Sequence, residues 1–214
     1  MGVNWAAVAG GNNCKMEMAM DEVREKKQEI RSEISSFFKS LDSDVLAANT
    51  HIIENRLFEF ANFLESKIVM LYVNAENEVA TDNIIKRAYE YSKIVVLPAF
   101  DAAKATMKLM KVDNPDKDLI AGSRGFLEPN PAKCKPVPVD CIDIAIVPGV
   151  AMDEKGGRVG SGDGYYDRII PDLPMTTRKV GLVFEGQLIP QVPMESHDKH
   201  VDIIITEKRV IYKI

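Results

Sequence analysis

Residues 143–168 read DIAIVPGVAMDEKGGRVGSGDGYYDR, and no other stretch of the chain says as much about its architecture. The apolar run at 143–147, ended by Pro148 and Gly149, is typical of a strand covered on both faces. Five glycines then lie within nine residues, at positions 156, 157, 160, 162 and 164. Glycine allows positive φ and close approach to the backbone, and successive amides in such a turn form an anion nest. A strand followed by this turn indicates an α/β protein whose ligand lies beyond the carboxyl ends of its strands.

Charged and aromatic side chains accompany the glycines. Arg158 and Arg168 can contribute full positive charges, and a helix opening at 165–168 would add the partial charge of its N-terminus. The segment is not a Walker A loop, because no Gly-Lys-Ser/Thr ends it, and it lacks the G-x-G-x-x-G dinucleotide fingerprint. These features favour a phosphate-binding turn of another kind over a plain glycine-rich connection.

Short apolar runs and helical periodicity alternate on both sides of this turn. The clear strands are expected at 67–73, 93–98, 143–149, 179–184 and 202–206, with weaker ones at 106–112 and 209–212. Helices are expected at 21–41, then over a buried stripe formed by Ile52, Ile53, Leu57, Phe60 and Leu64, and then after Thr81. This alternation predicts an α/β three-layer sandwich with a mostly parallel central sheet. The connection at 113–140 is expected to run over the surface and to be functional.

The composition limits the organisation and partners of the protein. Its 214 residues, 46% of them hydrophobic, suit a single domain at 21–214 preceded by a disordered leader at 1–20. A net charge of −5 without a long basic run argues against nucleic acid, and the acidic balance argues against a membrane surface. Three scattered cysteines without a C-x-x-C pair indicate reduced thiols in a cytoplasmic protein.

The stretch at 143–168 resembles the signature of the 5-formyltetrahydrofolate cyclo-ligase family, also called methenyltetrahydrofolate synthetase. Other family patterns occur in the same order, and together they extend the resemblance over roughly residues 24–207. They are Lys27-x-x-Ile30-Arg31, Glu78-Val79-Ala80-Thr81, Phe126-Leu127-Glu128-Pro129, Val183-Phe184-Glu185-x-Gln187 and Pro193-x-x-x-His197-Asp198. The resemblance implies a fold like that of NagB, RpiA and the CoA transferases.

The resemblance also implies a reaction. Such enzymes use ATP and Mg²⁺ to convert 5-formyltetrahydrofolate into 5,10-methenyltetrahydrofolate, with release of ADP and phosphate. The formyl oxygen is a poor leaving group until it is phosphorylated, after which N10 attacks the activated carbon. The partners implied are therefore small molecules, ATP and a reduced folate, for a monomer or weak homodimer.

The matched motifs assign roles to individual residues. The ATP set comprises Lys27, Arg31, Arg158, Gly160, Ser161, Gly162, Asp163, Gly164, Tyr165 and Tyr166. The folate set comprises Val73, Glu78, Gly162 and Tyr165, with Tyr72 expected in the same pocket. Arg158 and Asp167 are the expected catalytic residues, and Asp167 and Asp198 the expected Mg²⁺ ligands, since oxygen ligands suit that hard cation.

One residue departs from the family pattern. Asp163 stands where members usually carry glycine or a basic residue, and an acid there repels a triphosphate unless Mg²⁺ or an arginine lies near. Two alternatives therefore stay open. The chain could be a divergent member that binds nucleotide or folate with little cyclo-ligase activity. It could also handle a sugar phosphate or coenzyme A on a similar scaffold.

Overall fold

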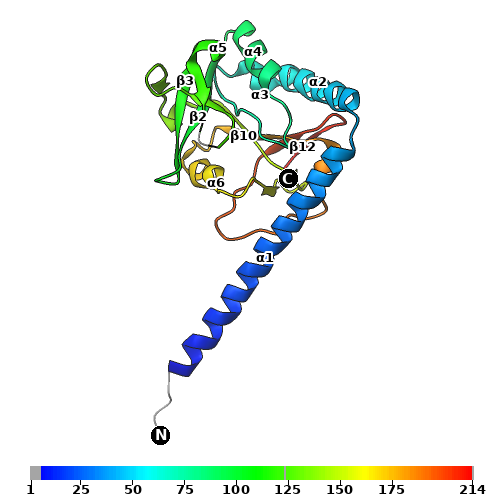
Figure 1. The fold of residues 1–214 in the computed structure, drawn as a ribbon. Helices are drawn as coiled ribbons and strands as arrows, with labels where there is room; N and C mark the ends of the chain where they lie inside the picture. Colours follow the sequence, from blue (N-terminus) through cyan, green and yellow to red (C-terminus); the bar gives the residue numbers. More distant parts are fainter. Residues whose placement is uncertain (1–5, 123, 214) are drawn as a thin grey trace.

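The computed structural model describes the backbone of residues 6–122 and 124–213, and the side chains of residues 18, 20–122 and 124–213. Eight strands form the main sheet. In chain order they are β1 (Ile68–Met70), β2 (Ile94–Asp101), β3 (Thr106–Val112), β6 (Lys135–Pro136), β7 (Ile144–Val147), β10 (Arg178–Leu182), β11 (Ile203–Ile205) and β12 (Val210–Tyr212). Their spatial order is β12-β11-β10-β7-β1-β2-β3-β6 (Figure 1).

The five central strands run parallel, from β11 through β10, β7 and β1 to β2. The outer strands β12, β3 and β6 pair antiparallel at the two edges. The central strands carry the continuous apolar runs of the sequence, and every residue of β7 is buried. A parallel strand needs this pattern because helices or loops cover both of its faces. The prediction of an α/β fold with a mostly parallel sheet is thereby confirmed.

The helices are α1 (Ala6–Ser40), α2 (Ser43–Glu59), α3 (Ala61–Glu65), α4 (Asp82–Glu90), α5 (Pro115–Asp118) and α6 (Tyr165–Ile169). Short 3₁₀ turns occur at Val139–Cys141, Ile170–Asp172 and Glu185–Gln187. In Figure 1, α2, α3 and α4 gather on one side of the sheet, and α6 and α1 lie on the other. Asp42 caps α2 by accepting hydrogen bonds from the amides of Asp44 and Val45, as its side chain predicts.

The predicted stripe of the second helical segment is partly wrong. The helix breaks at Phe60, which has extended φ and ψ, and α3 restarts one residue later. Ile53, Leu57 and Phe60 are buried, whereas Ile52 is 40% exposed and Leu64 is 46% exposed. Ile52 and Ile53 are neighbours and cannot share one helix face, and the break changes the facing of Leu64.

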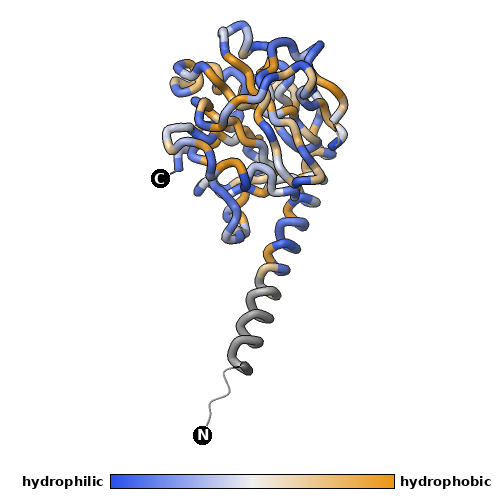
Figure 2. The backbone as a smooth tube through the Cα atoms, turned by 90° about the vertical axis from the view of Figure 1, so that its left-hand side faces the viewer, coloured by the Kyte–Doolittle hydropathy of each residue, from blue (hydrophilic) through white to orange (hydrophobic). Residues whose placement is uncertain are grey.

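The first helix also differs from expectation. Residues 6–20, for which the sequence predicts a disordered leader, continue α1 as one helix, while residues 1–5 lie outside the described part of the chain. Figure 2 shows α1 leaving the globular part as an extended rod. Extending an existing helix avoids the cost of nucleating a new one, so the periodic segment after residue 21 can propagate toward the N-terminus.

The connection at 113–140 is more ordered than predicted. It contains α5, a hairpin of β4 (Leu119–Ala121) and β5 (Leu127–Pro129), and the edge strand β6. Glu128 of β5 accepts a hydrogen bond from the amide of Phe100 in β2, which ties the hairpin to the main sheet. In the described part of the chain, no helix combines the length and apolar character that crossing a bilayer requires.

Candidate active site

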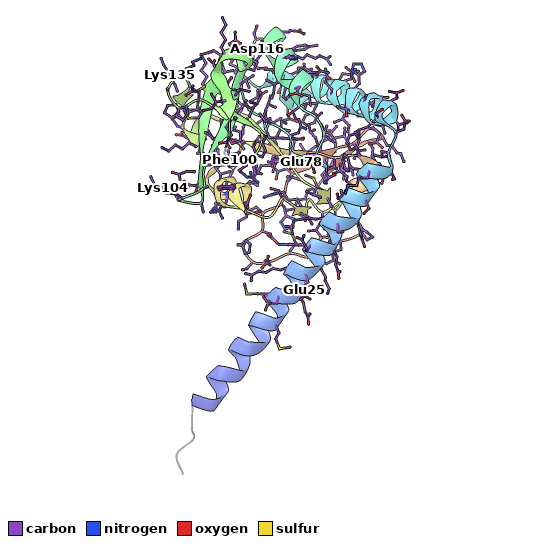
Figure 3. All side chains as sticks on the ribbon, in the orientation of Figure 1. Glu25, Glu78, Phe100, Lys104, Asp116 and Lys135 are labelled. Carbon is purple, nitrogen blue, oxygen red and sulfur yellow. The ribbon has the colours of Figure 1, made fainter. Side chains whose placement is uncertain are left out.

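A cleft of about 630 Å³ opens where α1, the glycine-rich turn, α6 and the segment around 195–198 meet. Pro148, which follows β7, lies in its wall, so the cleft is at the carboxyl end of the parallel strands. In Figure 3, Glu78 is labelled near the centre of the molecule and Phe100 just above α6. In open α/β sheets this edge is where ligands bind.

Nearly all the residues expected at the site line this one cleft. The lining includes Lys27, Arg31, Glu78, Arg158, Gly160, Ser161, Gly162, Asp163, Gly164, Tyr165, Tyr166, Asp167 and Asp198. Val73 lines a smaller adjoining pocket that shares Glu78, Pro148, Ser161 and Tyr166 with the cleft. Tyr72 is the exception, because it is buried in the core and donates its hydroxyl to the carbonyl of Val79. The structure thus brings together segments separated by more than a hundred residues of sequence.

The glycine-rich turn connects the β8 (Ala151–Met152) and β9 (Arg158–Val159) hairpin to α6. Gly162 has φ of 122° and Gly164 has φ of 64°, and Gly164 is the residue from which α6 starts. Residues other than glycine rarely adopt such positive φ angles, so the glycines determine the backbone path of the turn. Arg31 of α1 donates its Nε to the Gly160 carbonyl at 2.8 Å, which holds the long helix against the turn. Burial lowers the pKa of Arg31, and Asp163 and Asp198 oppose that shift.

Arg158 is the most unusual side chain of the cleft. It is only 4% exposed, and its Nε and Nη2 make no hydrogen bond within the described part of the protein. Nη2 does lie 2.8 Å from Asp167 Oδ1, an ion-pair distance. A buried guanidinium whose N–H donors have no acceptor costs free energy unless a ligand accepts hydrogen bonds from them. Arg158 is therefore a candidate partner for an anion in the cleft.

Asp167 lies opposite Arg158 in the first turn of α6. Its Oδ1 faces Arg158 and also accepts a hydrogen bond from the Lys199 amide at 3.0 Å. Both of these contacts with described residues are made by Asp167 Oδ1, and Oδ2 makes neither of them. One oxygen therefore orients the carboxylate, and the other is left for a ligand in the cleft.

Lys27 is held between two acids that come from the far end of the chain. Its Nζ lies 2.9 Å from Glu195 Oε2 and 2.5 Å from Asp198 Oδ2, and all three side chains are less than 10% exposed. Glu195, His197 and Asp198 offer ligand atoms within 4.8 Å of one another, a spacing suited to a cation. Sequence reasoning missed Glu195, because it stands at an unspecified position of the Pro193-x-x-x-His197-Asp198 pattern.

Glu78 forms the end of the cleft that adjoins the smaller pocket. Its Oε2 accepts a hydrogen bond from the Ala75 amide at 2.9 Å. Burial raises the pKa of Glu78 above the ordinary value, while the Ala75 amide, Arg124 and Arg158 partly offset that shift. Burial therefore destabilises the ionised form of the carboxylate, which can still accept hydrogen bonds from further donors.

Arg124 is a second residue that the sequence did not single out. It comes from the turn of the β4–β5 hairpin, and its Nη2 lies 2.6 Å from Asp163 Oδ2 and 3.0 Å from Ser161 Oγ. The acid that departs from the family pattern therefore has an arginine beside it. No local pattern marks Arg124, because its partners are nearly forty residues further along the chain.

Comparisons with known proteins bear directly on this cleft. The family model described as "5-formyltetrahydrofolate cyclo-ligase family" matches residues 23–207. The probable 5-formyltetrahydrofolate cyclo-ligase of Caenorhabditis elegans is 29% identical, over 90% of this chain and 98% of that protein. The corresponding probable enzyme of Schizosaccharomyces pombe is 30% identical, over 88% of this chain and 98% of its own length.

A solved structure agrees with these sequence matches. The 5,10-methenyltetrahydrofolate synthetase of Aquifex aeolicus superimposes with a TM-score of 0.76 at 28% identity, covering 87% of this chain and 92% of that one. The motifs, the fold and the matched length point the same way, and they confirm the family predicted from the sequence. The chain belongs to the 5-formyltetrahydrofolate cyclo-ligase family of enzymes.

Proposed function

We propose that the protein converts 5-formyltetrahydrofolate and ATP into 5,10-methenyltetrahydrofolate, ADP and phosphate. The formyl oxygen attacks the γ-phosphorus and the bond to ADP breaks. N10 then attacks the formyl carbon and loses its proton, and phosphate departs with the former formyl oxygen. The observation that carries the proposal is Arg158, a buried guanidinium in the wall of the cleft whose Nε and Nη2 make no hydrogen bond with the described residues.

The nucleotide side is assigned to the glycine-rich turn and α1. The amides from Gly160 to Tyr166, with the N-terminus of α6, would hold phosphate oxygens, and Arg158 would neutralise charge that develops on the transferred group. Lys27 and Arg31 reach the same cleft from α1. Lys27 is paired to two carboxylates, so we expect it to exchange those partners for phosphate when ATP binds. Positioning and electrostatics would supply most of the rate enhancement.

The Mg²⁺ that such a reaction needs fits the donors of this cleft. Asp167 and Asp198 are the proposed ligands, and Glu195 is a further oxygen donor beside Asp198. Hard oxygen ligands are those that Mg²⁺ prefers. When bound, the ion would neutralise phosphate charge. Arg158 and the Lys199 amide would keep Asp167 oriented, and these contacts do not depend on the ion.

The folate side is assigned to Glu78 and Val73. A carboxylate at the mouth of the smaller pocket can accept two hydrogen bonds from an aminopyrimidine edge, and Val73 gives an apolar wall for the ring. Gly162 and Tyr165, which line the large cleft, would contact both ligands. A single domain at 21–214, acting in the cytoplasm as a monomer or weak homodimer, completes the proposal.

The test is a turnover assay with purified protein, ATP, Mg²⁺ and 5-formyltetrahydrofolate, followed by the near-ultraviolet absorbance of the methenyl product. Absorbance that grows only with all three additions supports the proposal. Absence of product at high enzyme concentration contradicts it and favours the divergent-member reading. A sugar-phosphate or coenzyme A enzyme would bind those ligands and leave the folate unchanged.

Asp167 gives the sharpest single variant. Asp167→Ala is expected to lower kcat at least a hundredfold, because the metal ligand and the partner of Arg158 are lost together. Asp167→Asn keeps an acceptor for the Lys199 amide and separates orientation from charge. Near-normal Mg²⁺-dependent turnover of both variants would remove Asp167 from the mechanism.

A further inference from the structure

Arg124 and Asp163 form an ion pair that the proposed chemistry does not use. Asp163 lies in the glycine-rich turn and Arg124 in the turn of the β4–β5 hairpin, so the pair links two loops that both line the cleft. Both hydrogen bonds of Arg124 to described residues start from one terminal nitrogen, Nη2. Its Nε and Nη1 are thereby left for other partners, because an arginine has five N–H donors.

Aromatic rings hold the guanidinium of Arg124 in place. Its central carbon lies 4.7 Å from the ring centre of Phe100, 5.1 Å from Phe126 and 5.2 Å from Tyr165. Phe100 in turn packs edge-on against both of the other rings. A planar guanidinium suits this surrounding, whereas a lysine ammonium would lose the stacking. The side chain is only 18% exposed, so it is part of the wall and not a loose surface charge.

Arg124 lies at the border between the large cleft and the smaller pocket. It lines the large cleft and also the smaller pocket, whose other walls include Val73, Phe126 and Leu127. In the present arrangement the smaller pocket measures only about 20 Å³, which is room for a single water molecule. A pterin ring is larger than this volume, so a ring bound against Glu78 and Val73 would extend into the cleft past Arg124, which lines both.

We propose that Arg124 is a positioning residue for the reduced folate, and that Asp163 serves the folate side of the site by holding Arg124 over the pocket. This inference rests on the proposed function and refines it, because the sequence motif alone placed Asp163 among the ATP contacts. Arg124 neutralises the acid that would otherwise repel the triphosphate. Its Nε and Nη1 then donate to the carbonyl oxygen of the pterin.

The test is a double-mutant cycle with Arg124→Gln, Asp163→Asn and the double variant, measured as KM for each substrate. Each single change is expected to raise KM for the folate about tenfold, the size of one lost charge-assisted hydrogen bond. Asp163→Asn should leave KM for ATP within about twofold, whereas Arg124→Gln should raise it as well, because Asp163 is then no longer neutralised. The double variant should be no worse than either single one, because both act through the same contact. Arg124→Lys should recover only part of the loss, since charge returns without the planar face.

Lys111→Gln and Asp113→Asn provide the matched control. These residues form an exposed ion pair at the end of β3, with 2.7 Å between Lys111 Nζ and Asp113 Oδ1. Neither residue lines the cleft or the smaller pocket. Additive effects of the two loop variants, or a rise in KM for ATP with the folate unaffected, would overturn the inference while the parent enzyme remains active. An inactive parent that also fails to bind 5-formyltetrahydrofolate by calorimetry would instead overturn the proposed function, and this inference with it.

Discussion

Single residues of the cleft show a conflict between stability and ligand binding, and Glu78 is the clearest case. Burial raises its pKa, so the folded state binds a proton more tightly than the unfolded chain does. Ionisation of this carboxylate therefore costs the folded state stability as the pH rises above the ordinary range of a glutamate. Such a cost is expected where a group is kept for binding and not for folding.

Glu78→Gln is accordingly expected to raise the Tm by a few degrees at pH 7 while it weakens folate binding. The glutamine oxygen can still accept the Ala75 hydrogen bond. The gain in Tm should vanish below the ordinary pKa range of a glutamate, where the native side chain is neutral too. Calorimetric melting at both pH values checks this, and a lower Tm at pH 7 would show that the charge itself stabilises the fold.

The same carboxylate predicts a pH dependence of binding. Folate affinity of the parent should fall as the pH is lowered through the raised pKa of Glu78, because a protonated carboxyl no longer accepts both hydrogen bonds. Titration calorimetry over a series of pH values measures it. In Glu78→Gln the affinity should be weaker and nearly flat with pH, and an unchanged slope would assign the titration to another group.

At the level of elements, the β8–β9 hairpin leads into the glycine-rich turn, and its geometry depends on a glycine with positive φ. Gly156 has φ of 84°, and a Cβ there would lie 2.2 Å from the Val201 carbonyl oxygen. Gly125 has φ of 86° with nothing within 4 Å of such a Cβ. The two glycines therefore have nearly the same φ and differ in what surrounds them.

Gly156→Ala is expected to lower the free energy of unfolding by roughly 3 kcal/mol, since conformational strain and a backbone clash add. Gly125→Ala should cost about 1 kcal/mol, from the left-handed conformation alone. Chemical denaturation of both variants gives the comparison. Equal losses would mean that the contact with Val201 relaxes freely.

The sequence predicts the elements well where they are buried and less well where they are not. The strand after Asp143 and the turn after it follow from an apolar run and clustered glycines, which are local signals. The hairpin within 113–140 escaped prediction, because its short strands are partly exposed and lack a strong period. Arg124 and Glu195 escaped for a related reason, since their partners are distant in sequence and only folding brings them into contact.

In the molecule as a whole, the family resemblance and the strand–helix alternation predicted the fold class and the residues gathered at the cleft. The long α1 was not predicted over residues 6–20. Among the described side chains of α1, Arg24 forms an ion pair with Glu195, and Lys27 and Ile34 are buried against the rest of the molecule. The domain proposed at 21–214 should therefore not depend on the part of the helix before it.

Deletion of residues 1–20 is expected to change the Tm by less than about 2 °C and kcat/KM by less than about twofold. The shortened α1 would begin at Asp21, an acid that suits the first turn of a helix. Thermal melting and the turnover assay check this. Loss of folding or of activity would place a structural or functional contact before residue 21.

The oxygen of the formyl group provides the most direct test of the proposed chemistry. Substrate labelled with ¹⁸O in the formyl group is turned over with ATP and Mg²⁺ in unlabelled water, and the released phosphate is analysed by mass spectrometry. Transfer of this oxygen to phosphorus predicts one ¹⁸O in each phosphate formed, in equal amount with ADP and the methenyl product. Unlabelled phosphate, with the isotope released to water, would contradict phosphorylation of the formyl oxygen.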